Sequence, residues 1–164
     1  MNIRLTITLL FVMLVGACST TNTSQTPKQI NIECGLEMQA ARTAVRLRDK
    51  GKPKSSLLAQ LAPVTEESSR LLVEMHEITH EVYAVTELNE VIYPTYRYNL
   101  CQRELLHKPV PTSIELVLPL LLDCQRKHQD KSSQQSTRCI QMAIENSAEK
   151  HQQTDTEINN ATNH

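Results

Sequence analysis

Glycine is so scarce in this chain that its scarcity constrains the fold more than any other feature. Three of the 164 residues are glycine, and beyond residue 18 only Gly35 and Gly51 remain. Hairpin turns, phosphate-binding loops and the strained turn that carries a nucleophilic serine all need glycine at fixed positions. The chain is instead rich in Leu, Ala, Glu, Gln and Arg, which favour helices. We therefore predict an all-α fold, in a chain long enough for one domain.

The first 17 residues have the three parts of a secretory signal. Arg4 precedes an apolar run from Leu5 to Val15, and the small residues Gly16 and Ala17 follow. A charged start, an apolar middle and a small-residue cleavage site are typical of such a signal. The run is too short to span a bilayer, which takes roughly 20 residues. The sequence therefore predicts a signal peptide at 1–17 and export of the remaining chain.

The end of this segment, Val15-Gly16-Ala17-Cys18, resembles the lipobox of bacterial lipoprotein signals. The resemblance implies that the leader is cut before Cys18, and that Cys18 becomes the lipidated first residue. The chain would then be bound to a membrane through its lipid anchor. In this family an Asp after the cysteine is linked with retention at the inner membrane, and here Ser19 stands in that place. The resemblance therefore implies the outer membrane, facing the periplasm, in a Gram-negative cell.

Four cysteines follow Cys18, and an even number in an exported chain predicts two disulfides. Three pairings are possible. We favour Cys34–Cys101, which would join the ends of one helical unit, and Cys124–Cys139, which would close a helical hairpin. A metal site is the alternative reading of these cysteines. No pair of them has the spacing of two to four residues that is typical of zinc fingers and ribbons.

The pattern beyond the signal predicts a tether, one helical domain and a tail. Residues 18–31, rich in Ser, Thr, Asn and Gln, are expected to form a flexible lipidated tether. Residues 32–150 are expected to form a domain of about five helices, and residues 151–164 a disordered tail. Apolar stripes and capping residues place the helices from near 32 to 50, from Ser55 to 61, from Thr65 onward, from Pro94 past 105, from 112 or 113 to 127, and around Cys139.

The segment from Cys34 to Cys101 resembles a set of small exported bacterial proteins. They share a cysteine near the start, an Arg-Asp/Gln-x-Gly helix end, a later helix ending in Val/Ala-Tyr, and a second cysteine beyond it. Here these features are Cys34, Arg48-Asp49-Lys50-Gly51, Val82-Tyr83 and Cys101. The resemblance implies a helical fold and no particular activity.

One motif suggests chemistry, because His76-Glu77-Ile78-Thr79-His80 matches H-E-x-x-H. On a helix the two histidines lie on one face and can bind one zinc ion, and the glutamate between them can act as general base on metal-bound water. The motif is similar to that of the zincin metallopeptidases. This resemblance implies His76 and His80 as ligands, Glu77 as the base, and zinc as the cofactor.

A third zinc ligand is missing from the expected places. Tyr83 and Thr86 stand where the metzincin pattern has a glycine and a histidine, and Glu90 and Glu104 are the nearest carboxylates for the gluzincin pattern. Catalytic zinc needs three protein ligands. We therefore expect the two histidines and Glu77 to lie on a helix surface without a catalytic role, and we expect no cofactor.

Three tyrosines, Tyr93, Tyr96 and Tyr98, follow one another closely. Because tyrosine is enriched at interfaces, they are a candidate binding patch. We favour the other reading, in which their rings fill the junction between two helical units.

Charged residues are spread along the chain, whose net charge is −1. No basic block of the kind that binds phosphates is present, so we expect no nucleic-acid partner. On the first helix, Arg42, Arg46 and Arg48 are expected to pair with Glu33 and Glu37 on a solvated face.

Together these features predict a lipid-anchored protein of the cell envelope with a non-catalytic role, either binding an envelope partner protein or structural. The alternative is a small membrane-anchored zinc metallopeptidase. The two hypotheses differ in whether a third ligand lies within reach of His76 and His80.

Overall fold

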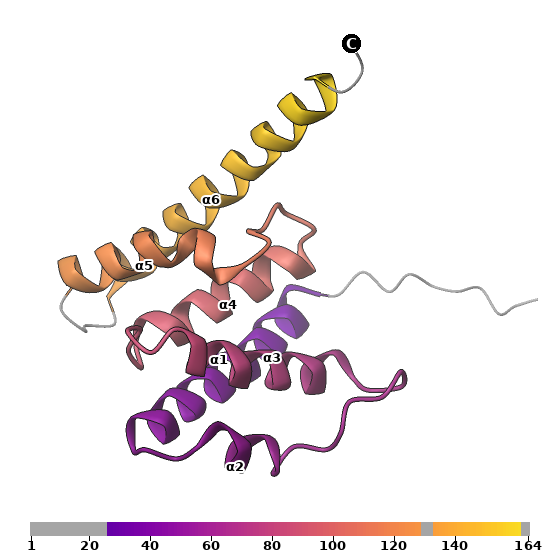
Figure 1. The fold of residues 1–164 in the computed structure, drawn as a ribbon, viewed down its shortest axis with the longest axis vertical. Helices are drawn as coiled ribbons and strands as arrows, with labels where there is room; N and C mark the ends of the chain where they lie inside the picture. Colours follow the sequence, from indigo (N-terminus) through magenta and orange to yellow (C-terminus); the bar gives the residue numbers. More distant parts are fainter. Residues whose placement is uncertain (1–25, 129–132, 162–164) are drawn as a thin grey trace, which may run out of the picture.

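The computed structural model describes residues 26–128 and 133–161. Every regular element in these residues is an α-helix, which confirms the predicted all-α fold (Figure 1). The helices are α1 (Pro27–Asp49), α2 (Lys54–Leu58), α3 (Arg70–Ala84), α4 (Ile92–Leu105), α5 (Ile114–His128) and α6 (Gln134–Ala161).

The helices form two units that meet at α4. In the first unit α1 packs against α3 and α4, and α2 packs against α3. In the second unit α5 and α6 pack against each other as a hairpin, and α6 also contacts α4. Figure 1 shows the backbone of α6 running out beyond the other helices toward the C-terminus. None of the described helices is long and apolar enough to cross a membrane.

One disulfide joins two helices in each unit. Cys34 on α1 is bonded to Cys101 on α4, with 5.5 Å between their Cα atoms. Cys124 on α5 is bonded to Cys139 on α6, with 5.8 Å between their Cα atoms. Both predicted pairings are therefore confirmed, and the structure is the small disulfide-stapled helical domain expected from the sequence.

One apolar core runs through both units, because α4 contributes to each of them. Its fully buried members include Tyr93 and Tyr96 on α4, Val117 and Leu121 on α5, and Ile140 on α6. The Cys34–Cys101 disulfide lies in a smaller buried cluster with Ile30. Both units bury large side chains in the same core. This shared burial explains why a chain with few aromatic residues still forms one domain.

The start of α1 differs from the prediction, which placed residues 27–31 in the tether. The helix begins at Pro27 because Thr26 and Gln29 form a capping box. The Gln29 backbone N–H donates to Thr26 Oγ1 at 3.3 Å, and the Thr26 N–H donates to Gln29 Oε1 at 2.9 Å. Proline is favoured at the first helical position. The rest of the tether and the predicted signal, with Cys18, lie outside the described residues.

The start of α3 also differs from the prediction, which used Thr65 as its cap. Ser69 caps the helix instead, because its side chain accepts from the backbone N–H of Leu72. Thr65 forms a turn with Ser68, whose hydroxyl accepts from the Thr65 N–H at 2.8 Å. The short α2 begins one residue before the predicted Ser55. Several serines and threonines in this region can cap, and tertiary contacts select among them.

At the other end of the chain, the backbone of α6 is helical to Ala161 and so passes residue 150, where we expected a disordered tail to begin. No proline or glycine follows Pro119 in the sequence, so nothing in the backbone ends this helix earlier. The last residues, 162–164, lie outside the described part of the chain, as do residues 129–132 between α5 and α6.

Hydrogen bonds from the Arg48 side chain connect the end of α1 to the end of α3. Its guanidinium donates to the carbonyl oxygens of Val82 and Val85, each at 3.1 Å, and of Leu88 at 2.8 Å. These carbonyls lie at or beyond the last turn of α3, where backbone acceptors have no partner within the helix. Arg48 is therefore not on the solvated face predicted for it, because its side chain reaches across to α3.

The turn after α1 is completed by Gly51 and Tyr83. Gly51 has a φ of +73°, which glycine adopts readily, and the Tyr83 hydroxyl donates to the Lys52 carbonyl. Of the residues behind the resemblance to small exported proteins, Arg48, Val82 and Tyr83 thus connect the end of α1 to α3, whereas Cys34 and Cys101 join α1 to α4.

Candidate functional site

The H-E-x-x-H histidines each contact a different neighbour. The His76 Nε2 atom lies 2.9 Å from the carbonyl oxygen of Ala62, and His80 Nδ1 lies 3.5 Å from Lys54 Nζ. Ala62 follows α2 and Lys54 begins it, so both histidines lie where α2 packs on α3. Within residues 26–128 and 133–161, no group of three His, Cys, Asp or Glu side chains is arranged to bind a metal ion.

Both carboxylates considered as a third zinc ligand have other partners. Glu90 pairs with Arg46 at the surface, and a Glu104 carboxylate oxygen lies 3.8 Å from Arg70 Nη1. Glu77, the base in the peptidase hypothesis, is exposed on α3. The described residues thus provide the two histidines of the motif without a third ligand beside them.

The proposed tyrosine patch is wrong for two of its three members. Tyr93 and Tyr96 are fully buried, with ring centroids 6.3 Å apart, and they belong to the core that joins the two units. The Tyr93 hydroxyl donates to Glu81 at 2.8 Å. Tyr98 is half-buried and its hydroxyl accepts from Gln102 at 3.0 Å. The favoured reading, in which the rings fill the junction, is confirmed for Tyr93 and Tyr96.

A cluster of buried charges lies between α1, α3 and α4, and its centre is Arg97. Arg97 is 2 % exposed and its guanidinium contacts three carboxylates. It lies 3.2 Å from Glu81 Oε2 and 3.6 Å from Glu37 Oε2, and it also binds Glu74. In the described structure, Glu37 Oε2 and Arg97 Nε have no hydrogen-bond partner. Such a cluster holds the three helices in one register, since each helix contributes part of it.

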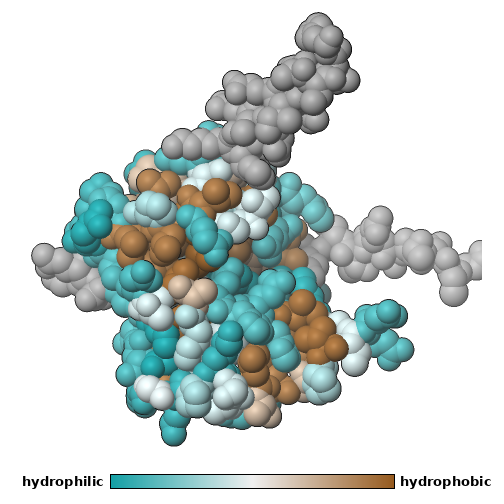
Figure 2. Space-filling view, in the orientation of Figure 1, coloured by the Kyte–Doolittle hydropathy of each residue, from teal (hydrophilic) through white to brown (hydrophobic). Residues whose placement is uncertain are grey.

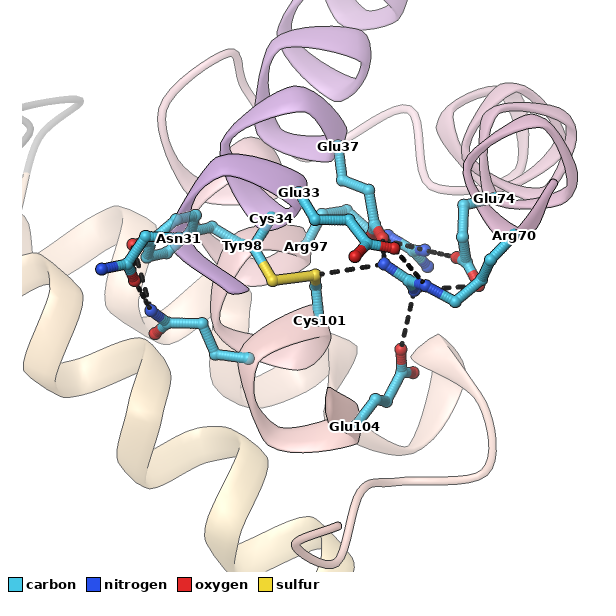
Figure 3. Close-up of a disulfide and its surroundings, with 11 residues drawn as sticks. Asn31, Glu33, Cys34, Glu37, Arg70, Glu74, Arg97, Tyr98, Cys101 and Glu104 are labelled. Carbon is cyan, nitrogen blue, oxygen red and sulfur yellow. Dashed lines mark hydrogen bonds and ion pairs between the residues drawn. A yellow bond between two sulfur atoms is a disulfide. The ribbon is translucent and has the colours of Figure 1, made fainter. Parts of the chain in front are cut away.

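Arg70 extends this cluster toward the disulfide, as Figure 3 shows. Its guanidinium lies 2.8 Å from Glu33 Oε1 and 2.6 Å from Glu37 Oε1, and its Nη2 donates to Cys101 Sγ at 3.6 Å. Glu37 is therefore not on a solvated face, as predicted, but is fully buried. The sequence did contain a signal for this burial, because Glu37 lies one turn from both Cys34 and Ala41 on the buried face of α1.

Carboxylates outnumber guanidinium groups in this cluster, which affects their protonation. Burial raises the pKa of Glu37, with the Arg70 and Arg97 guanidiniums opposing the shift. Burial also raises the pKa of Glu104 to about 7, and the nearby Glu74 carboxylate adds to the shift. At neutral pH part of the Glu104 carboxyl group is therefore protonated. The members are Glu33, Glu37, Glu74, Glu81 and Glu104 against Arg70 and Arg97.

An apolar groove with a volume of about 340 Å³ lies between α1, α2 and α3. Small-molecule sites typically have volumes of roughly 300–1,000 Å³ and mainly apolar walls. Figure 2 shows apolar surface at the lower right of the molecule, in the region of α2 and α3. The groove is lined by Leu36, Gln39, Ala40, Thr43, Ala44, Leu47, Leu57, Gln60, Leu61, Leu71, Met75, Ile78 and Thr79.

The groove forms because α1 carries two apolar stripes. One stripe, with Cys34 and Ala41, faces α3 and α4 and is buried. The second runs from Leu36 through Ala40 to Leu47 and lines the groove. Ala40 has only a methyl side chain, so the surface of α1 is recessed at this point. Leu36, at one end, is 45 % exposed. Both stripes recur at helical spacing, so the sequence contains a signal for the second stripe as well as for the first.

The contacts of the H-E-x-x-H histidines bear on this groove. They hold α2 and the residue Ala62 against α3, and α2 contributes Leu57 to the groove wall. In this structure the two histidines of the motif therefore contact the segment that packs against α3 beside the groove.

Comparison of the chain with protein-family models, with curated proteins and with solved structures found no match.

The raised pKa of Glu104 predicts how stability depends on pH. Its pKa is about 7 in the folded chain, against an ordinary value of 4.5, so folding favours the protonated acid. This stabilisation is present in full below about pH 4.5 and is lost as the pH rises through about 7. One pKa unit corresponds to about 1.4 kcal/mol. Because the side chain is 33 % exposed, we expect screening to reduce the fall in unfolding free energy to about 1–2 kcal/mol.

Urea unfolding at a series of pH values, on the wild type and on Glu104→Gln, measures this dependence. The variant is expected to show a smaller decline between pH 4.5 and 7 than the wild type, while Glu37 and Glu77, whose pKa values burial also raises, account for the decline that remains. Hydrogen bonds lower the pKa values of three surface carboxylates, Glu90, Glu115 and Asp123. These groups make the free energy of unfolding rise with pH, but only at a lower pH than the decline caused by Glu104. An equal decline in both proteins would contradict the prediction.

Proposed function

We propose that this chain is a lipid-anchored, non-catalytic binding protein of the bacterial cell envelope, and that its ligand site is the apolar groove between α1, α2 and α3. The observation that carries the proposal is the groove itself, whose volume and apolar walls fit a ligand site. A role in binding needs a preformed apolar surface that is open to solvent, and exposed Leu36 and half-buried Leu71 and Met75 provide one.

The envelope location is supported by two independent features. The first 18 residues have the order of a lipoprotein signal that ends at Cys18. Two disulfides, Cys34–Cys101 and Cys124–Cys139, are typical of chains that fold in an oxidising compartment. Under this proposal Cys18 carries the lipid, and the domain binds its ligand on the periplasmic side of the outer membrane.

Filling the groove tests the proposal. Ala40 lines the groove, and the ring of Ala40→Phe would occupy the space above it. With Nile red, an uncharged apolar dye, as the probe, we expect wild-type protein to bind and enhance its fluorescence. We expect Ala40→Phe to weaken binding by about tenfold or more, since the ligand loses most of its apolar contacts.

The matched control is Asn146→Phe, which places the same ring at an exposed position of α6, away from the groove. Its affinity for the dye should equal that of the wild type, and circular dichroism should show unchanged helix content in both variants. Binding that is unaffected by Ala40→Phe, or no binding to the wild type, would overturn the proposed site.

A further inference from the structure

The two ends of the apolar groove carry different charges, although its walls carry none. All the residues that line it are uncharged. At one end, Lys50, Lys52 and Lys54 follow the last lining residue of α1, Leu47, and precede the first lining residue of α2, Leu57. We call these three residues the lysine end of the groove.

Two contacts confirm the position of the lysine end relative to α3. The Lys52 carbonyl accepts from Tyr83, which lies one turn beyond the last lining residue of α3, Thr79. Lys54 Nζ lies 3.5 Å from the ring of His80, which follows Thr79 directly. The three lysines therefore lie where the C-terminal parts of the α1 and α3 walls meet the start of α2.

The lysine end has no neutralising partner. Lys50, Lys52 and Lys54 are all exposed, and no ion pair joins any of them to a carboxylate among the residues that the structure describes. The loop near the opposite end carries two exposed carboxylates, Glu66 and Glu67. A ligand with an apolar body and an anionic group at one end is complementary to this arrangement.

The groove is long and its walls are mainly apolar. From Leu36 to Leu47 it follows α1 for about 16 Å at 1.5 Å per residue. An extended dodecyl chain has a similar length, and its methylene groups match the uncharged walls.

We propose that the groove binds a single-chain anionic amphiphile, with the acyl chain between α1, α2 and α3 and the anionic headgroup at the lysine end. This inference rests on the proposed function, since it assigns a ligand class to the same groove. Burial of the methylene groups provides the affinity, and the lysines orient the chain and select the charge of its headgroup.

The test compares three dodecyl amphiphiles below their micellar concentrations: dodecanoate, dodecyl maltoside and dodecyltrimethylammonium. Calorimetric titration of the full chain at low ionic strength should give a dissociation constant in the micromolar range for dodecanoate. We expect the neutral and cationic compounds to bind about tenfold more weakly, and the preference to shrink at high salt. The variant Lys50→Gln/Lys52→Gln/Lys54→Gln should bind dodecanoate no better than dodecyl maltoside.

The control variant, Lys108→Gln/Arg126→Gln/Arg138→Gln, removes three exposed cations elsewhere and should keep the preference. If dodecyl maltoside binds as tightly as dodecanoate and the lysine variant changes nothing, the charge assignment is overturned while the proposed function stands. Dodecanoate binding that Ala40→Phe does not weaken would place it outside the groove and overturn the inference. If none of the three compounds and no Nile red binds, the proposed function fails as well.

Discussion

Replacing Arg97 with leucine is expected to lower the free energy of unfolding by about 3–5 kcal/mol, because it removes the only fully buried cation that the described structure contains. The carboxylates of Glu37, Glu74 and Glu81 would lose this partner. Arg70 would still pair with Glu37 and Glu74, but it is 33 % exposed and does not reach into the buried position of Arg97. The cluster would therefore keep buried carboxylates with too little positive charge beside them, which costs more than the net contribution of the pairs. Urea denaturation followed by circular dichroism measures the loss.

The matched control is Arg46→Leu on the same chain. Arg46 pairs with Glu90, and the two side chains are 57 % and 47 % exposed. Exposed pairs of this kind contribute about 0–1 kcal/mol, so the control should be nearly as stable as the wild type. If Arg97→Leu is too unstable to fold, Arg97→Lys, which keeps the charge but loses the planar fork, should fold with a smaller loss. Equal stability of the two leucine variants would contradict the role assigned to Arg97.

Removing the Cys34–Cys101 disulfide has the second large expected effect. The bond closes a loop with a sequence separation of 67 residues, whereas Cys124–Cys139 closes one of 15. Closure of a loop restrains the unfolded chain, which corresponds to about 4 kcal/mol for the longer loop and about 3 kcal/mol for the shorter one. We expect Cys34→Ala/Cys101→Ala to unfold at a correspondingly lower urea concentration than the wild type.

The double variant Cys124→Ala/Cys139→Ala serves as the comparison. It should lose somewhat less stability than the first variant, and reduction of the wild type with dithiothreitol should lower stability by more than either variant alone. A larger loss from the short loop than from the long one would contradict the loop-closure argument. Unchanged stability in both variants would show that the unfolded chain is not restrained by these bonds.

Much of the fold could be predicted because it depends on local patterns. The apolar periodicity beyond Thr65 made the existence of α3 predictable, and Pro94 lies in the first turn of α4. The two disulfide pairings followed from an even cysteine count and from the positions of the helices. Helix starts were less predictable, because Thr65 and Ser69 are both good caps and the helix uses only one.

The candidate site was not predictable in the same way. Glu37 and Arg48 were expected on a solvated face, yet Glu37 is covered by α3 and α4, and Arg48 reaches the end of α3. Likewise the expectation that His76 and His80 lie on a helix surface did not include their contacts with Ala62 and Lys54. Each of these outcomes depends on which helix lies opposite, and a single helix pattern does not contain that information.

The sequence by itself determined the helical class of the domain and its two disulfides, because these depend on backbone preferences, periodicity and cysteine count. Only the tertiary structure decided that Tyr93 and Tyr96 are core, that Arg97 is enclosed by carboxylates, and that the second stripe of α1 remains open as a groove. The physical reason is that burial and charge pairing are properties of two surfaces in contact. They arise only when helices from distant parts of the chain pack together.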